Sequence, residues 1–249
     1  MSMLITLPSN SSGEEFPDNN NSEFTVRLYK YLVINGGKWE VALLDMTYSN
    51  NWKNVTEGKI YLEKTNVSGK SEKSFILIGN GRYDSIEELE EIIRKRMSEM
   101  DLDKKFAISY NKITNTALLT NSDPDTAISF SKDIAYIFGF ESQTTYPRGR
   151  YNNITPPDIN SGLTSLYVYS NIVDNRMVGD TNVPLLRVVP VQGKKNSVVY
   201  QEFKNPHYVD ASSLNSDMIK VLITSDDGQR IPFDGGKVVL TVHYREKEL

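Results

Sequence analysis

Short apolar runs alternate with clusters of Gly, Asn and Asp along almost the whole chain, and this pattern constrains the fold more than any other feature of the sequence. The runs are rich in Val, Ile, Leu, Tyr and Phe and recur about every ten residues, which is typical of short strands joined by turns. We expect strands at 24–29, 39–48, 59–63, 74–78, 106–110, 116–119, 165–169, 185–189, 197–203, 218–224 and 237–244. The pattern therefore predicts a mainly β protein, built as an antiparallel β-sandwich.

The first two runs flank Asn35, Gly36 and Gly37, which are turn-forming residues. Because Asn and Gly tolerate the positive φ angles of tight turns, the simplest interpretation is a β-hairpin. The run at 39–48 carries apolar residues at both odd and even positions, so we expect both faces of that strand to be covered.

Two helices interrupt the pattern of strands. Ser85 and Glu88 stand at the spacing of a capping box, in which each side chain bonds the backbone at the start of a helix. The next residues place apolar side chains along one helical face: Ile86, Leu89, Ile92, Ile93 and Met97. This stripe predicts a helix that packs on the sheet. A second, shorter helix is expected at 133–138, ended by Gly139.

The chain is long enough, at 249 residues, to form one sizeable core, so we expect a single sandwich domain at 24–249. Residues 1–23 are rich in Ser, Asn, Glu and Asp, a composition that buries little apolar surface. We expect them to form a flexible N-terminal arm. The helix-bearing segment at 71–162 is expected to be an insertion, because a minimal sandwich needs no helix.

The formal net charge is −4, so the chain has no overall positive field that would attract a phosphate backbone. We therefore expect no strong nucleic-acid binding. Cysteine is absent, which excludes disulfides and zinc–thiolate sites and suits a reducing compartment. No stretch approaches the roughly 20 apolar residues needed to span a bilayer, and the first residues lack a signal-peptide pattern. We expect neither membrane insertion nor secretion by a signal peptide.

Catalytic and metal-binding chemistry has few candidates. The two histidines, His207 and His243, have no partner at metal-ligand spacing, and His243 is expected on the more polar face of its strand. Acidic groups at 123–125, 226–227 and 87–91 could hold calcium or flank a glycosidic bond. Turn capping and the solvent face of a helix explain these groups better. We predict no catalytic, cofactor-binding or metal-binding residues, and a protein that is not an enzyme.

Two long segments resemble a known family when they are read as wholes. The first is 24–55, which contains the run Trp39-Glu-Val-Ala-Leu-Leu-Asp-Met-Thr-Tyr48, and the second is 166–191. Both resemble the penton (minor capsid) proteins of Polinton/Maverick elements, and 203–208 and 231–244 fit the same pattern. The middle of the chain, 63–162, matches more loosely.

The resemblance implies a single jelly roll and a virophage-like vertex protein of a virion. It implies a homopentamer at the five-fold vertices of an icosahedral particle, beside a double-jelly-roll major capsid protein, produced and assembled inside the host cell. It implies no cofactor. The chain length agrees with this minor role, because a double jelly roll would need two such sandwiches.

Aromatic residues in the expected loops are the candidate interface anchors, namely Trp52, Tyr146, Tyr151 and Tyr208. Large aromatic side chains dominate the energetics of protein interfaces. Each of the four could equally cover the core of its own sandwich. Exposed aromatics and turn acids also leave a second function open, a carbohydrate- or ligand-binding β-sandwich module.

Overall fold

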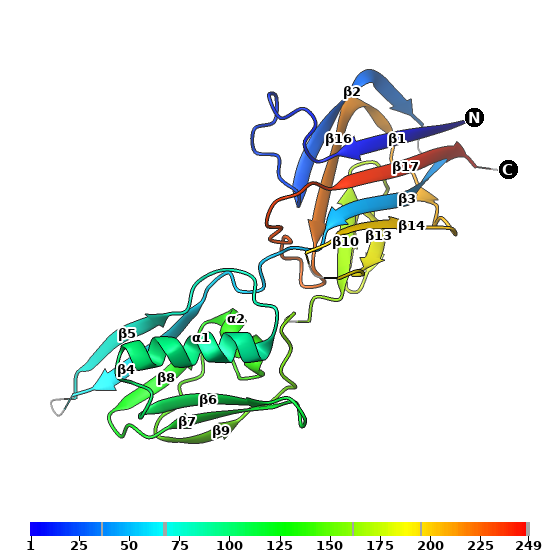
Figure 1. Cartoon of the computed structure of the whole chain (residues 1–249). Helices are drawn as coiled ribbons and strands as arrows, with labels where there is room; N and C mark the ends of the chain where they lie inside the picture. The colour runs from blue at the N-terminus through cyan, green and yellow to red at the C-terminus, as the bar shows by residue number, and fades with distance from the viewer. Residues whose placement is uncertain (36, 67–68, 161, 195, 248–249) are drawn as a thin grey trace. The chain divides into compact units, whose positions relative to one another are not determined.

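The computed structural model describes residues 1–35, 37–66, 69–160, 162–194 and 196–247. Within it the chain forms two compact units, which are considered separately below (Figure 1). The sandwich unit comprises Met1–Trp52 and Leu163–Leu249, and the inserted unit comprises Lys53–Gly162.

The sandwich unit consists of two antiparallel sheets. Sheet A has the order β1 (Ser2–Pro8), β17 (Val239–Glu246), β3 (Trp39–Ser49) and β14 (Val198–Glu202), and β15 (Val209–Asp210) also pairs with β3. Sheet B has the order β13 (Leu185–Pro190), β10 (Ser165–Ser170), β16 (Leu214–Thr224) and β2 (Glu23–Ile34). A small hairpin, β11 (Arg176–Val178) and β12 (Thr181–Val183), lies between β10 and β13 in the chain.

The strand order of the sandwich unit is that of a jelly roll. Successive strands of the two sheets alternate along the chain between sheets A and B, with two exceptions: β10 and β13 both lie in sheet B, and β14 and β15 both lie in sheet A. The first strand, β1, pairs with the last, β17, so the chain wraps around the core and returns to its start. Four strands in each sheet with this wrapping define a single jelly roll. The structure confirms the predicted mainly β, antiparallel sandwich with a helix-containing insertion.

The core of the sandwich unit lies between the two sheets, because each strand turns alternate side chains inward. On β3 the inward side chains include Val41, Leu43 and Tyr48, which are fully buried. Each such burial stabilises the fold by about 1.5–3 kcal/mol. Ala42, on the opposite face of β3, is fully buried as well. The prediction that both faces of this strand are covered is confirmed.

The prediction of a flexible arm at residues 1–23 is wrong for the first residues. Ser2–Pro8 form β1, which pairs with β17 from Ser2↔Arg245 to Pro8↔Val239 and buries Leu7 in the core. The following loop is tied to β2, because the Asn19 side chain accepts the N–H of Thr25 at 2.9 Å and donates to its carbonyl at 2.8 Å. The polar composition of the loop led to the prediction of an arm, although a strand precedes the loop.

The predicted hairpin of 24–29 with 39–48 is also wrong. β2 pairs with β16 in sheet B, and β3 pairs with β17 and β14 in sheet A, so the intervening residues cross between sheets. Of the expected turn, Gly36 lies outside the described residues, and Gly37 has a positive φ of 86°. Gly37 has the turn conformation that the sequence predicts, but the strands on either side of this segment belong to different sheets.

The inserted unit has its own core, formed by two three-stranded sheets and two helices. The first sheet has the order β5 (Ser71–Leu77), β4 (Lys59–Thr65) and β8 (Thr126–Phe130), and the second has the order β6 (Phe106–Asn111), β7 (Thr116–Asn121) and β9 (Gly149–Asn152). Helix α1 (Ile86–Glu99) packs on β5 and β6, and α2 (Lys132–Phe138) packs on β8 (Figure 1).

The insertion begins earlier than the predicted 71–162. The unit starts at Lys53, because β4 pairs with β5 and β8 and with no strand of the sandwich. Its predicted helices are confirmed. Ser85 caps α1 by accepting the N–H of Glu88 at 3.1 Å, and Gly139 ends α2 with a φ of 75°.

Two fully buried tyrosines of the sandwich core differ in one hydrogen bond. Tyr48 Oη accepts the backbone N–H of Gln192 at 3.0 Å. Tyr244 Oη has no hydrogen-bond partner among the described residues. Burial raises the pKa of both hydroxyls above its ordinary value, and for Tyr48 the bond from Gln192 opposes the rise.

We predict that Tyr244→Phe raises the free energy of unfolding by about 1 kcal/mol, because it removes a buried hydroxyl that lost its water without gaining a partner. Tyr48→Phe is the matched control and lowers the free energy of unfolding by about 1 kcal/mol, because it leaves the Gln192 N–H without an acceptor. Urea unfolding measures both changes. If both substitutions raised the free energy of unfolding, or both lowered it, the difference in hydrogen bonding between the two hydroxyls would be contradicted.

Candidate interaction surface

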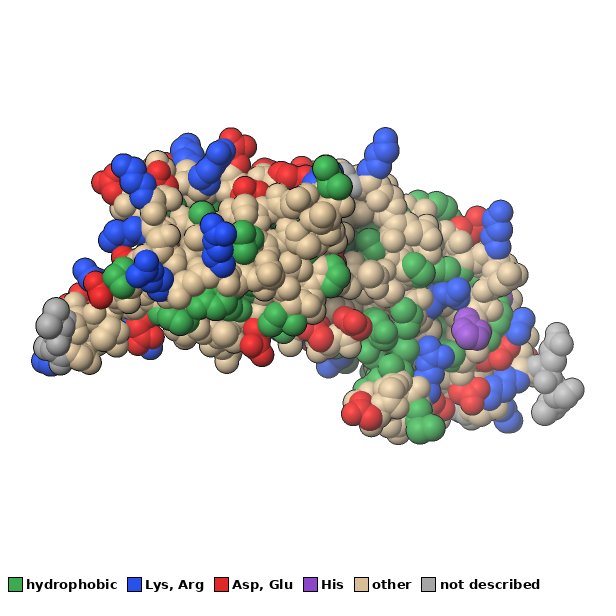
Figure 2. All heavy atoms as spheres, turned by 90° about the horizontal axis from the view of Figure 1, so that it is seen from below, with side chains coloured by type: hydrophobic (Ala, Val, Ile, Leu, Met, Phe, Trp, Pro, Cys, Tyr) green, Lys and Arg blue, Asp and Glu red, His purple; other side chains and the backbone are tan. Residues whose placement is uncertain are grey.

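The surface of the chain mixes hydrophobic patches with charges of both signs, as Figure 2 shows for the face that it draws. Across the described residues, no three His, Asp or Glu side chains converge in a way that could hold a metal ion. Neither of the two helices of the described chain has the length and apolar character needed to cross a bilayer. The side chains that stand out are exposed aromatics and unpaired charges on the strands of the sandwich unit.

Two of the four predicted interface aromatics are buried in their own cores. Trp52 is only 5% exposed and meets Phe233 edge-on, with ring centroids 6.1 Å apart. Tyr146 is 6% exposed and packs between Phe130 and Phe140 in the inserted unit. For these two the structure shows the alternative that the sequence left open, in which the ring covers the core of its own unit.

The other two predicted aromatics remain at the surface. Tyr151 is half-buried, with its ring 5.1 Å from that of Tyr146. Tyr208 lies over the outer face of sheet A, where its hydroxyl is 2.7 Å from His243 Nδ1. The guanidinium of Arg245 stacks 3.6 Å from the Tyr208 ring. Tyr208 is therefore held in place by a ring contact and a hydrogen bond within its own chain.

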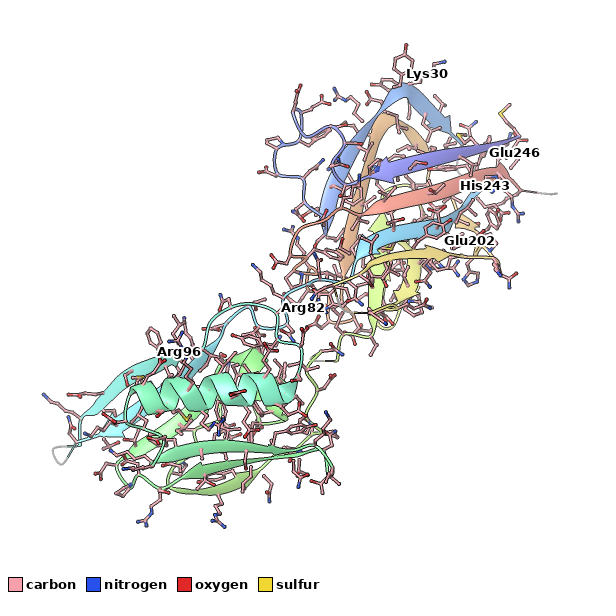
Figure 3. The ribbon with its side chains drawn as sticks, in the orientation of Figure 1. Lys30, Arg82, Arg96, Glu202, His243 and Glu246 are labelled. Atoms are coloured by element: carbon pink, nitrogen blue, oxygen red, sulfur yellow. The ribbon has the colours of Figure 1, made fainter. Side chains whose placement is uncertain are left out.

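The structure places His243 on the outer, more polar face of sheet A, as the alternation of β17 predicts (Figure 3). Its neighbours Leu240, Val242 and Tyr244 point to the core. His207, the other histidine, is exposed in the loop before β15. The prediction for the position of His243 is confirmed.

Most acidic side chains on the strands of sheet A have a cation partner. Glu40 pairs with Arg245 at 2.5 Å, and Asp210 pairs with Lys247 at 2.8 Å. A third acid, Glu246, bonds the N-terminal amine at 2.8 Å. These pairs gather at one end of the sheet, near the chain termini.

Asp45 and Glu202 are the exceptions on sheet A, since neither has an ion-pair or hydrogen-bond partner for its carboxylate among the described residues. They lie directly opposite each other on β3 and β14. Like charges in register across two strands destabilise a sheet. Next to them on β14, Tyr200 is 64% exposed, and its pKa is raised by the negative charge of Asp45, by partial burial and by Glu202. We call Asp45, Tyr200 and Glu202 the acidic patch.

The most exposed aromatic side chains of the sandwich unit lie on the edge strand β2. Tyr29 is 97% exposed and Tyr31 is 68% exposed, with Lys30 between them (Figure 3 labels Lys30 at the bend of the strand). Sequence reasoning missed both tyrosines. The sequence does contain a pattern that indicates their exposure. Tyr29, Tyr31 and Val33 stand at alternate positions and point outward, while Leu32 and Ile34 point inward.

The acidic turns behave as the sequence predicts. In the inserted unit, Asp123 accepts the N–H of Asp125 at 2.9 Å, which is the self-capping of a turn. Its buried carboxylate also pairs with Lys105 at 3.0 Å. Burial by itself would raise the pKa of Asp123, but the hydrogen bond from Asp125 and the Lys105 charge outweigh it and lower the pKa.

A surface hollow of ≈ 600 Å³ lies beside this turn, between the end of β4 and the start of β8. Among the described residues, its lining is polar or aliphatic: Lys64, Thr65, Asn66, Pro124, Asp125, Thr126, Ala127 and Pro147. It offers no aromatic platform of the kind on which a sugar ring would stack.

We predict that Asp123→Asn lowers the free energy of unfolding of the inserted unit by about 1–3 kcal/mol at neutral pH, because it removes a buried, bonded charge. The folded-state pKa lies below the ordinary value of 3.8. The stabilisation by Asp123 is therefore fully present above the unfolded-state pKa and is lost as pH falls through the folded-state pKa.

Denaturant unfolding of wild type and Asp123→Asn between pH 7 and pH 2 measures this effect. The difference in free energy of unfolding between wild type and Asp123→Asn should become smaller only below about pH 4. Asp103→Asn, at an exposed aspartate of the same unit, is the control and should change stability by less than about 0.5 kcal/mol. A difference that stays constant to the lowest pH would show that the charge of Asp123 is not the cause.

No family model matches the sequence, and no curated protein matches it. Among solved structures, the crystal structure of the mavirus penton protein aligns with 99% of this chain and 100% of its own, at 10% identity and a TM-score of 0.49. The structure of the Sputnik virophage, solved by cryo-EM, contains a chain that aligns over 99% of this chain and 98% of its own, at 8% identity and a TM-score of 0.48. The strand order of the chain itself, and not this likeness, defines the fold.

Proposed function

We propose that this chain is a structural minor capsid protein, a penton that forms the five-fold vertices of the virion-like particle of a Polinton/Maverick-type element. In this role it is not an enzyme. Its partners are further copies of itself in a homopentamer and a double-jelly-roll major capsid protein. It acts in the virion, after assembly inside the host cell.

The observation that carries the proposal is where the family-like segments fall in the fold. The segments at 24–55 and 166–191 include β2, β3, β10 and β13, and the segment at 231–244 includes most of β17. All of these strands belong to the jelly roll. The loosely matching segment at 63–162 lies in the inserted unit. The resemblance therefore concerns the part of the chain whose architecture recurs in capsid subunits.

The physical character of the sandwich unit agrees with a subunit that closes rings. A ring forms when one surface of each copy meets a different surface of the next. Two of the four sheet edges of the jelly roll differ in chemistry, with an aromatic and basic edge at β2 and an acidic edge at β14. The alternative, a carbohydrate- or ligand-binding module, lacks a matching feature, because no aromatic residue is among the described residues that line the hollow beside β8.

We predict that co-expression of the chain with the major capsid protein of the same element gives closed icosahedral particles with this chain at the five-fold vertices. Cryo-EM of the particles, with and without the chain, provides the measurement, and the jelly roll should fit the vertex density. Particles whose vertices are filled by the major capsid protein alone, with the chain absent or bound elsewhere, would refute the proposal.

A further inference from the structure

The edge strand β2 carries a projecting tip. Arg27 pairs with Met218 of β16 and Leu32 pairs with Ser216, so residues 28–31 of β2 lie opposite Asp217 alone. This long bulge pushes the chain away from the sheet and presents Tyr29, Lys30 and Tyr31 to solvent, which we call the tip. Exposed edge strands are sites at which chains associate, and native edges are usually short or charged. The tip instead presents two aromatic rings.

The charge of the tip has no ion-pair partner among the residues that the structure describes. Of the two cations on this side of β2, Arg27 pairs with Glu15 and lies 3.4 Å from Asp217. Lys30 makes no ion pair with any described residue, and it lies between two exposed tyrosines (Figure 3). Exposed tyrosines are typical interface anchors because their rings supply buried area, and a charge beside them supplies specificity for a surface of opposite charge.

The acidic patch is the complement of this tip. Asp45 and Glu202 face each other across β3 and β14, neither has a cation partner in the described part of the chain, and Tyr200 beside them offers an exposed ring. The charges that act on the Tyr200 hydroxyl are both negative. An added cation would relieve the repulsion between the two carboxylates, and the exposed Val198 extends the apolar area around Tyr200.

The tip and the acidic patch lie at opposite edges of the sandwich. β2 is the outermost strand of sheet B, and β14 is the outermost strand of sheet A. β13, at the far edge of sheet B from β2, lies on the same side as β14, since Arg187 of β13 stacks 3.8 Å from the ring of Phe203 just after β14 (Figure 1). One copy therefore cannot satisfy its own patch with its own tip.

We propose that the tip of one copy docks on the acidic patch of a second copy, with Lys30 between Asp45 and Glu202 of that copy and the tip tyrosines against its Tyr200. This proposal rests on the proposed ring-forming function and names the contact that builds the ring. Because the two surfaces differ and lie on opposite edges, the contact is heterologous, so each copy can add another, and a ring results where the rotation between copies closes.

Charge reversal tests the pairing directly. Lys30→Glu and Glu202→Lys should each weaken association of the full chain about tenfold or more, because each places like charges together. The double variant Lys30→Glu/Glu202→Lys should restore most of the association. Sedimentation velocity over a concentration series measures all three against wild type, and circular dichroism establishes that each variant is folded.

Cysteine trapping tests the geometry, and the chain is suited to it because it has no cysteine of its own. Lys30→Cys mixed with Glu202→Cys should form a covalent dimer with a short bifunctional thiol crosslinker, since a lysine–carboxylate contact holds the two β-carbons farther apart than the roughly 4.5 Å that a direct disulfide requires. Either variant alone should stay uncrosslinked. Met177→Cys mixed with Glu202→Cys is the matched control, because Met177 is 87% exposed on β11 and belongs neither to the tip nor to the acidic patch.

The outcomes separate this inference from the proposed function. Restored association in the double variant together with selective trapping supports the contact. If wild type assembles into rings or vertices and neither charge reversal weakens the assembly, the contact is wrong while the penton role stands. The same holds if Lys30→Cys crosslinks to a second copy of itself. If wild type never self-associates in solution or in particles, both are wrong.

Discussion

The pairing of the first strand with the last is the interaction on which the rest of the sandwich unit depends. β1 forms an antiparallel ladder with β17, and β17 in turn pairs with β3 at the centre of sheet A. This ladder joins residues more than two hundred positions apart, and the bond between the N-terminal amine and Glu246 continues it to the chain ends. Without it, sheet A would lose its edge strand, and Leu7 would leave the core between the sheets.

The two ends of the chain are bound together at one edge of sheet A. The parts of the jelly roll that can vary without breaking this pairing are the connections between strands and the other sheet edges. The connection between β3 and β10 accommodates a whole unit with its own core, so the insertion adds surface without disturbing the jelly roll. The edges at β2 and β14 carry unlike chemistry: a lysine among tyrosines at one and two facing acids at the other, none of them ion-paired with any residue that the structure describes. A jelly roll with two complementary edges is suited to repetition around an axis.

Local patterns predicted the local structure well. The cap at Ser85, the apolar face of α1 and the stop at Gly139 depend on residues close in sequence, and each is confirmed. Strand pairing depends on distant residues, so the sequence suggested a hairpin where the chain crosses between sheets, and an arm where β1 finds β17. Aromatic anchors were sought in loops, yet Trp52 is buried, while Tyr29 and Tyr200 lie exposed on strands. Their exposure follows from which strands end at an edge, which local sequence does not specify.

The central claim is that this jelly roll is an assembly subunit that meets its copies through two different edges. Native mass spectrometry of the purified full chain, at increasing concentration and low ionic strength, tests it most directly, because it counts subunits. With a chain mass of 28.2 kDa, the account predicts a population at five chain masses without a dominant dimer, as a heterologous contact requires. A strictly monomeric protein, or a dimer that adds no further copies, would contradict it.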